Sequence, residues 1–361
     1  MNSKERILAA IRHEVPDRIP VAVQEIEKEY EFSRYLGIQE HEPMVHPDIG
    51  YYSPAYAKVG IDCFRLEMAY AGELSVSPDG ETLNEWGAVA KKDYGTEHWY
   101  PLGNAESIAD IDRHAWPDPD QFDYARAAGK AAAISGDYAV RGPHWYPLLC
   151  RVFDLMGMEN ALVNMSCEPE LFEASLERVF EITYACTERL IETCGEHMPI
   201  VCGADDFGSQ RGLMLSPEAW RKYLKPRYAK LFELTKKHGK YVWFHSCGDI
   251  SPVLPDLIDI GMDVWETVQL HTLPISPEQL KREYGKHITF FGAVNSQRLP
   301  FQSPDEVRAE VRRCIDLLGE GGGYICSADH GIRADVPNEN IEALFSEAVA
   351  YRRPGYTLLT D

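Results

Sequence analysis

The sequence lacks any long apolar run. Nowhere do its 361 residues approach the ~18 consecutive apolar residues that a membrane-spanning helix needs. Basic residues are also scarce, because 36 Lys and Arg stand against 57 Asp and Glu, for a formal net charge of −21. Proteins that bind nucleic acid neutralise its phosphates with Lys and Arg, and anionic membranes attract basic segments. The acidic balance therefore predicts no nucleic-acid partner and no membrane partner.

Signals for export and for disulfide bonding are missing as well. The first residues, MNSKERILAAIRHEVPDR, are charged throughout and amphipathic, unlike the apolar core of a signal peptide. The nine cysteines are an odd number scattered over a long chain, as expected of reduced thiols. We therefore expect a cytoplasmic protein. Any Cys that is given a chemical role must be distinguished from the inert buried thiols common in protein cores.

Two further patterns are absent: a short-period repeat, and a GxGxxG loop after the first predicted strand, without which a Rossmann fold is disfavoured. Instead, short apolar strands alternate with helices. Strands are predicted at 19–23, 138–141, 199–203, 240–245, 262–266, 287–292 and 323–327, and the longest helices at 170–194 and 217–238. This alternation is typical of βα units around a parallel sheet and predicts an α/β fold, a distorted (β/α)8 TIM barrel. We expect one domain over residues 1–361, with an irregular N-terminal part, 1–120, that covers the barrel.

Polar side chains follow the predicted strands at their carboxyl ends, where TIM barrels carry their active sites. They are Asp205 and Asp206, His245 and Cys247, Gln269 and His271, Asn295, and Asp329 and His330. Their clustering on one rim, more than any single residue, indicates a functional site. Asp205 and Asp206 are candidates for a general base or for holding a substrate hydroxyl or a histidine, and loop capping is the competing interpretation. Gln269 is a candidate for orienting substrate or solvent.

His245-Ser-Cys247 is the most specific of these elements. Side chains on an extended chain repeat every second residue, so this imidazole and this thiolate can share a zinc ion at about 2.0 and 2.3 Å. A catalytic zinc needs a third protein ligand, for which His330 and Cys326 are the candidates. We prefer His330 because it lies in the loop after the last predicted strand, whereas Cys326 lies within that strand. The competing interpretation is a core histidine beside a buried, inert cysteine.

Six segments carry a resemblance to a known family: KERILAAIRHEVPDRIPV (4–21), VRGPHWYPL (140–148), GADDFGSQRGLMLSPEAWRKYLKP (203–226), HGKYVWFHSCGDISPVLPDLIDIGMDVWETVQ (238–269), FGAVNSQRL (291–299) and GGGYICSADHGIRADVPNENIEAL (321–344). Over nearly the whole chain, the sequence resembles the uroporphyrinogen decarboxylase superfamily, and within it the corrinoid-dependent, zinc-containing methyltransferases. The fold that this resemblance implies is a distorted TIM barrel, in agreement with the alternation of strands and helices.

The resemblance implies the transfer of a methyl group between a small substrate (a methyl ether, alcohol or thiol) and the cobalt of a corrinoid (cobalamin). It also implies a bound Zn²⁺, for which His245 and Cys247 are the matching residues, and it leaves the third ligand open between His330 and Cys326. Thiol-alkylating members carry a third zinc Cys where this sequence has His330, so O-demethylation is the favoured direction. The sequence contains no D-x-H-x-x-G corrinoid-binding module, and a small corrinoid protein is therefore the expected partner.

Two other functions stay open at this point. One is a metal-independent, uroporphyrinogen-decarboxylase-like lyase that uses Asp206 and His330 as acid and base. Decarboxylases of the family carry an Arg-rich segment near the N-terminus, whereas the stretch after Pro20 reads VAVQEIEKEYEF, whose acids would repel a polycarboxylate. The other is a non-enzymatic protein that binds a tetrapyrrole or corrinoid.

Overall fold

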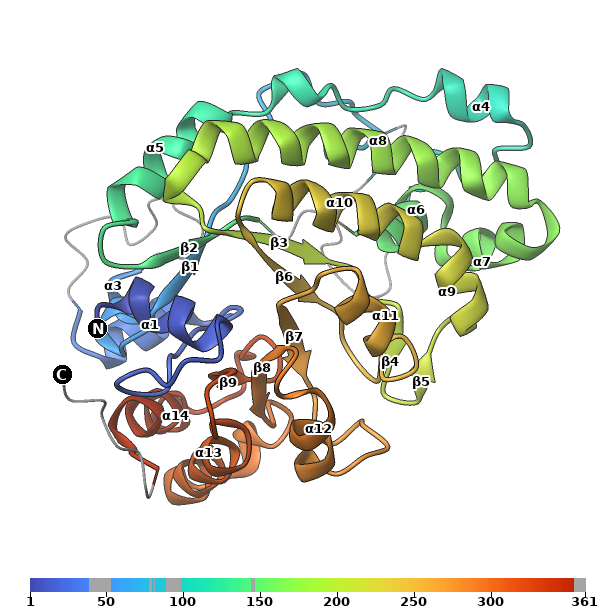
Figure 1. The fold of residues 1–361 in the computed structure, drawn as a ribbon. Helices are drawn as coiled ribbons and strands as arrows, with labels where there is room; N and C mark the ends of the chain where they lie inside the picture. Colours follow the sequence, from blue (N-terminus) through green and yellow to red (C-terminus); the bar gives the residue numbers. More distant parts are fainter. Residues whose placement is uncertain (39–52, 78–79, 81, 89–98, 144–146, 354–361) are drawn as a thin grey trace.

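A curled parallel sheet forms the centre of the molecule in the computed structural model, which describes residues 1–38, 53–77, 80, 82–88, 99–143 and 147–353 (Figure 1). Positions 144–146 of the segment 140–148 therefore lie outside the described residues. The strands are β1 (Cys63–Arg65), β2 (Ala139–Arg141), β3 (Ile200–Ala204), β4 (Gly208–Ser209), β5 (Gly212–Leu213), β6 (Tyr241–His245), β7 (Val264–Val268), β8 (Thr289–Val294) and β9 (Tyr324–Ala328).

Helices precede, connect and follow these strands. The α-helices are α1 (Ser3–Ile11), α2 (Glu29–Tyr35), α3 (Pro54–Lys58), α4 (Ile108–Arg113), α5 (Tyr124–Ile134), α6 (Leu148–Met156), α7 (Met158–Cys167), α8 (Pro169–Cys194), α9 (Pro217–Tyr223), α10 (Lys225–Lys237), α11 (Leu254–Asp259), α12 (Pro277–Tyr284), α13 (Pro304–Leu318) and α14 (Asn338–Ala350). Short 3-10 turns are η1 (Pro119–Gln121), η2 (Gly195–His197) and η3 (Leu299–Phe301). None of the described helices combines the length and the apolar character needed to cross a bilayer.

The sheet is closed into a barrel by a segment too short to count as a strand. Within the described residues, seven parallel strands pair in the order β1-β2-β3-β6-β7-β8-β9. Val21 forms a parallel bridge to Cys326 of β9, and Ala22 forms another to Cys63 of β1. The predicted strand at 19–23 thus lies between the two edges of the sheet and takes the eighth position. The predicted TIM-barrel fold is confirmed.

Helix α1 covers the amino-terminal end of the barrel. Its Ile7, Ala10 and Ile11 pack in one cluster with residues from the strands, among them Trp243 and Phe291. Because α1 closes this end with apolar side chains, the opposite end, where the strands have their carboxyl termini, is the one left for polar chemistry. Helices α8 and α10 lie outside β3 and β6, whereas α13 and α14 lie beside β9 (Figure 1).

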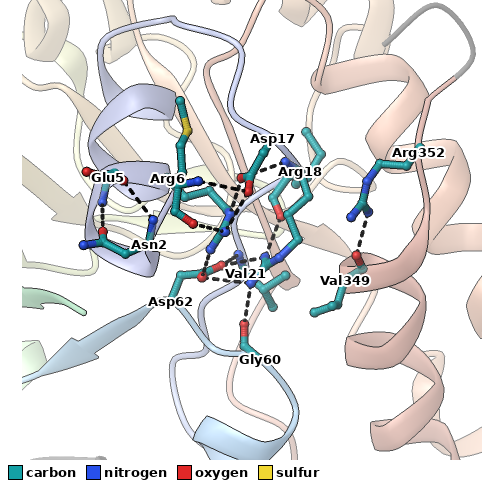
Figure 2. Close-up of polar contacts among 12 residues, drawn as sticks. Asn2, Glu5, Arg6, Asp17, Arg18, Val21, Gly60, Asp62, Val349 and Arg352 are labelled. Carbon is teal, nitrogen blue, oxygen red and sulfur yellow. Dashed lines mark hydrogen bonds and ion pairs between the residues drawn. The ribbon is translucent and has the colours of Figure 1, made fainter. Parts of the chain in front are cut away.

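A buried charge network fixes the closing segment to the rest of the barrel. The Asp62 carboxylate is fully buried and lies 2.7 Å from guanidinium nitrogens of both Arg6 and Arg18, as Figure 2 shows. It also accepts the backbone N–H of Val21 at 2.9 Å. Arg6 in addition pairs with Asp17 at 2.7 Å. A buried carboxylate needs such partners, because burying an unpaired charge is costly, so the network sets the position of the segment that joins the two sheet edges.

Two details differ from the predicted elements. The helix predicted at 217–238 is two helices, α9 and α10, which meet at Leu224. Pro226 lies in the first turn of α10, where the missing proline N–H costs nothing, whereas in the middle of one long helix it would remove a hydrogen bond. The strand β1 was not predicted, because its three residues are too few for a hydrophobic pattern to appear.

Candidate functional site

Four neighbouring strands bring their polar ends together around one cavity. The cavity has a volume of about 410 Å³ and lies at the carboxyl ends of the strands. Its lining includes Cys247, Gln269, Ser296 and His330, which follow β6, β7, β8 and β9. Because the strands are parallel, the loops at their carboxyl ends meet on one rim, as predicted.

Asp206, His245 and Cys247 form a compact group of three different ligand types. One ligand atom from each lies within 4.8 Å of the other two. His245 Nε2 is 3.4 Å from Cys247 Sγ and 3.5 Å from Asp206 Oδ1. The same Asp206 oxygen accepts the backbone N–H of Cys247 at 2.8 Å. The register of β3 and β6 explains the approach, because Ala204 pairs with His245, and Asp206 follows two residues later.

The electrostatics of this group favour the charged forms of its members. Burial raises the pKa of Cys247, but hydrogen bonds with the His245 and His330 imidazoles lower it, and the net shift is downward. Burial raises the pKa of Asp206, but its contacts with His245 and with the Cys247 backbone hold it far below its usual range. Thiolate and carboxylate are the forms in which these side chains bind a metal ion.

The buried carboxylate of Glu266 contacts the imidazole of His245 on the side away from Asp206 and Cys247. Glu266 is fully buried, and its Oε1 lies 3.4 Å from His245 Nδ1. Its Oε2 accepts hydrogen bonds from the guanidinium of Arg141 and from the indole N–H of Trp243. The Arg141 guanidinium also lies 4.6 Å from the centre of the Trp243 ring. With Nδ1 facing Glu266, the ring of His245 presents Nε2 to Asp206 and Cys247.

Arg141 and Glu266 were not among the predicted site residues. A signal was present in the sequence, since MDVWETV places a glutamate inside an otherwise apolar strand. A charge in a buried strand requires a partner. The partner, Arg141, comes from β2, 125 residues away along the chain, and nothing local points to it.

Asp205 is placed differently from its neighbour. Its carboxylate is buried and accepts the backbone N–H groups of Leu149 and Cys150 at 2.8 and 2.9 Å. It also accepts the hydroxyl of Tyr228 at 2.5 Å. Burial raises the pKa of Asp205 to about 6, although these hydrogen bonds lower it. Asp205 thereby anchors the start of α6 to the barrel, whereas Asp206 lies beside His245 and Cys247, and neither aspartate is among the residues that line the cavity.

Gln269 and Gly248 fix the loop that carries Cys247. The side-chain oxygen of Gln269 accepts the backbone N–H of Gly248 at 2.8 Å. Gly248 has a φ of +76°, and a β-carbon there would lie 2.4 Å from the backbone oxygen of Ser209. Only glycine fits so close a backbone contact. The β4–β5 hairpin thus packs directly against the backbone of this loop and limits the positions that Cys247 can take.

The two candidates for a third zinc ligand occupy different surroundings. His330 lines the cavity, and its hydrogen bond with Cys247 raises the pKa of His330. Cys326 is fully buried in β9 among apolar residues, and burial raises the pKa of its thiol to about 12. Within the described residues, the group whose ligand atoms lie within 4.8 Å of one another contains Asp206 and neither His330 nor Cys326. Asp206, which the sequence suggested for acid–base work, is therefore a candidate metal ligand.

The donor set fits a zinc ion. Zinc binds thiolate, imidazole and carboxylate ligands, and catalytic sites use three of them. Imidazoles that bind a metal usually give their other nitrogen to a carboxylate, which is the position of Glu266 behind His245. The burial of His245 and the opening of Cys247 into the cavity leave one side of the group accessible to a small molecule.

Comparisons with known proteins agree with the fold. The model of the uroporphyrinogen decarboxylase (URO-D) family matches residues 149–351. A methionine synthase from Methanothermobacter thermautotrophicus is 33% identical over 93 residues, 26% of this chain and 30% of the relative. A uroporphyrinogen decarboxylase from Mannheimia succiniciproducens is 29% identical over 76 residues, 21% of each chain. The chain thus matches less than a third of the length of these two relatives.

A solved structure matches over a much longer stretch. A methyltransferase from Methanosarcina mazei superposes with a TM-score of 0.65 at 21% identity, covering 97% of this chain and 98% of the other. At this level of identity, the likeness describes the fold.

Proposed function

Because the chain belongs to the uroporphyrinogen decarboxylase family, we propose that it is a zinc-dependent methyltransferase. The methyl group moves between a small substrate and the cobalt of a corrinoid carried by a small partner protein. The observation that carries this proposal is the group of Asp206, His245 and Cys247, of which Cys247 lines the cavity. A metal-independent decarboxylase has no evident need for a thiolate, an imidazole and a carboxylate gathered within 4.8 Å.

The roles of the residues follow from their contacts. Asp206, His245 and Cys247 would hold the zinc ion, and Glu266 keeps the imidazole of His245 in the orientation that binding requires. A bound zinc ion supplies Lewis acidity, which lowers the pKa of a thiol or polarises the oxygen of a methyl ether. Gln269 holds the Cys247 loop and lines the cavity, where its amide group is available to orient the substrate. His330, next to the thiolate, is the further candidate ligand.

We propose demethylation of an ether or alcohol as the direction. A site with one thiolate among its ligands leaves the metal less electron-rich than a site with two, and therefore a better Lewis acid toward oxygen. Both residues that could complete this site, Asp206 and His330, offer oxygen or nitrogen. The buried position of Cys326 supports the same choice, since it keeps a second thiol away from the cavity.

Zinc analysis of purified variants tests the metal site. We expect about one zinc per chain in the native protein and its loss in His245→Ala and Cys247→Ala. His330→Ala should lower zinc affinity by the ~10- to 100-fold expected when a residue of a metal shell is removed. Cys326→Ser is the matched control and should bind zinc normally. Full zinc occupancy in both His245→Ala and Cys247→Ala would refute the site, and the loss of zinc in Cys326→Ser alone would move the third ligand to the strand.

A spectroscopic assay tests the reaction. The zinc-loaded protein is mixed with cob(I)alamin and a panel of methyl ethers, alcohols and methyl thioethers, and methylation of the cobalt is followed by absorbance. We expect transfer that depends on Cys247 and on zinc. Turnover of a porphyrinogen by metal-free protein would favour the lyase instead, and tight cobalamin binding without transfer from any donor would favour a non-enzymatic binding protein.

A further inference from the structure

Ser296 presents a hydrogen-bond acceptor, and no donor, to the cavity. It follows β8 and lines the cavity together with Cys247 and Gln269. Its hydroxyl oxygen lies 2.6 Å from Asp329 Oδ1, and its backbone N–H donates to the same oxygen at 2.9 Å. A backbone N–H can only donate, so Asp329 Oδ1 is an acceptor. The single hydroxyl hydrogen of Ser296 is therefore directed at Asp329, and only its lone pairs remain for a molecule in the cavity.

The Asp329 carboxylate, which orients the Ser296 hydroxyl, is itself held in place. Asp329 is fully buried at the end of β9, and its backbone N–H donates to Val294 at 2.8 Å. Its second oxygen, Oδ2, lies 3.4 Å from Nδ1 of His271, which follows β7. Residues from three loops of the rim thus form one chain, His271–Asp329–Ser296, that begins at a partly exposed imidazole and ends at the cavity.

We infer that Ser296 is a specificity-determining residue that distinguishes the demethylated form of the substrate from the methylated form. This inference rests on the proposed function, in which one form carries X–H and the other X–CH3, with X being oxygen or sulfur. An X–H group donates a hydrogen bond to the lone pairs of Ser296. An ether or thioether has only lone pairs at X, and two acceptors that face each other make no hydrogen bond. Asp329 and His271 are positioning residues, because they act only through the direction of the Ser296 hydroxyl.

A second serine of the same cavity provides a matched control. The hydroxyl of Ser209 donates to the Gly212 carbonyl at 2.8 Å and accepts the backbone N–H of Arg211 at 3.2 Å. Both its hydrogen and a lone pair are thereby used within the hairpin. Ser209→Ala removes one hydroxyl oxygen from the wall of the same cavity, as Ser296→Ala does. Unlike Ser296→Ala, it leaves in place the hydroxyl that a buried carboxylate orients.

The test measures the binding of phenol and anisole, a pair that differs only by O–H against O–CH3. Affinities for the zinc-loaded protein are determined by ligand-observed NMR titration, and the position of each probe by crystal soaking. We expect a preference for phenol of about 3- to 10-fold, the usual value of one neutral hydrogen bond, with the phenol oxygen on Ser296 Oγ. Ser296→Ala should abolish the preference, whereas Ser296→Thr and the control Ser209→Ala should retain it.

Asp329→Ala supplies a readout that a merely structural role would not move. Alanine removes the oxygen that accepts the Ser296 hydroxyl, so the hydroxyl hydrogen can turn toward the cavity, and the preference for phenol should fall or reverse in favour of anisole. Asp329→Asn still offers an oxygen to the backbone N–H and the hydroxyl of Ser296 and should retain the preference. Equal binding of the two probes by the native protein, absence of phenol from the cavity, or a preference that survives Ser296→Ala would overturn the inference. This binding test does not depend on methyl transfer. A Ser296-dependent preference in a protein without transfer activity would overturn the proposed function and leave this inference standing. Methyl transfer by a protein that shows no preference for phenol would overturn this inference and leave the proposed function standing.

Discussion

Replacing Glu266 by Gln should destabilise the protein severely, although the two side chains have nearly the same shape. Glu266 and Arg141 are an ion pair inside the barrel, with side-chain exposures of 0% and 1%. The substitution leaves the guanidinium buried without its charge partner, which costs about 3 to 5 kcal/mol. The free energy of unfolding of a protein is typically only about 5 to 15 kcal/mol, so this loss is a large part of the total.

The magnitude is measured by urea unfolding, followed by circular dichroism and by tryptophan fluorescence in the presence of EDTA. The chelator separates the effect of the ion pair from any effect on metal binding at His245. Glu14→Gln is the control, because Glu14 and Arg12 form a pair whose side chains are 54% and 44% exposed. Exposed pairs contribute about 0 to 1 kcal/mol, and this variant should unfold almost as the native protein does.

A double variant decides whether charge is the cause. In Arg141→Met/Glu266→Gln the buried cation is gone as well, and most of the lost stability should return, because replacing a whole buried pair by neutral groups is often tolerated. A loss below about 1 kcal/mol in Glu266→Gln, or a double variant no more stable than the single one, would refute this reasoning.

Two further predictions concern the N-terminal network and the Cys247 loop. Burial raises the pKa of Asp17, but its bonds to Arg6 lower it to about 2. Since the unfolded value is about 3.9, Asp17 stabilises the fold above that pH and loses this effect as the pH falls toward about 2. The free energy of unfolding of Asp17→Asn should therefore depend less on pH in this window, and an unchanged slope would contradict the assignment. Gly248→Ala places a β-carbon 2.4 Å from backbone atoms at a φ of +76°. It should lower the urea midpoint and weaken zinc binding through the displaced Cys247, and unchanged zinc affinity would show that the loop does not position the thiol.

The barrel was predictable because its signals are local. Apolar strands alternate with helices, and the helix starts carry Ser followed by Pro, as at Ser216, Ser276 and Ser303, whose side chains each accept a backbone N–H in the structure. The rim was predictable for a related reason, since parallel strands place their carboxyl ends together. The period of two along a strand is also sufficient to bring His245 and Cys247 side by side.

The remaining features depend on pairings between distant residues. Asp206 lies beside His245 because of the register of β3 against β6. Asp205 faces the start of α6 instead, where it accepts the hydroxyl of Tyr228. Neighbouring aspartates in a loop carry no sign of which one lies beside His245 and Cys247. The Arg141–Glu266 pair likewise joins β2 to β7, and its existence follows from the closed shape of the barrel, which no local pattern encodes.

The closure of the barrel by Val21 and Ala22 has a consequence for the order of folding. The bridge between Val21 and Cys326 joins residues 305 positions apart, and contacts of such separation form slowly because a long loop must first be closed. While the chain is being synthesised, the segment around Val21 emerges early but has no β9 to pair with until nearly all other residues have been made. The contacts of this segment with Asp62 and Cys63 join residues close in the chain and can form much earlier. We therefore expect the pairing of β9 with the segment around Val21 to be a late event of folding, and the apolar interior of the barrel to stay exposed in the nascent protein until that step is complete.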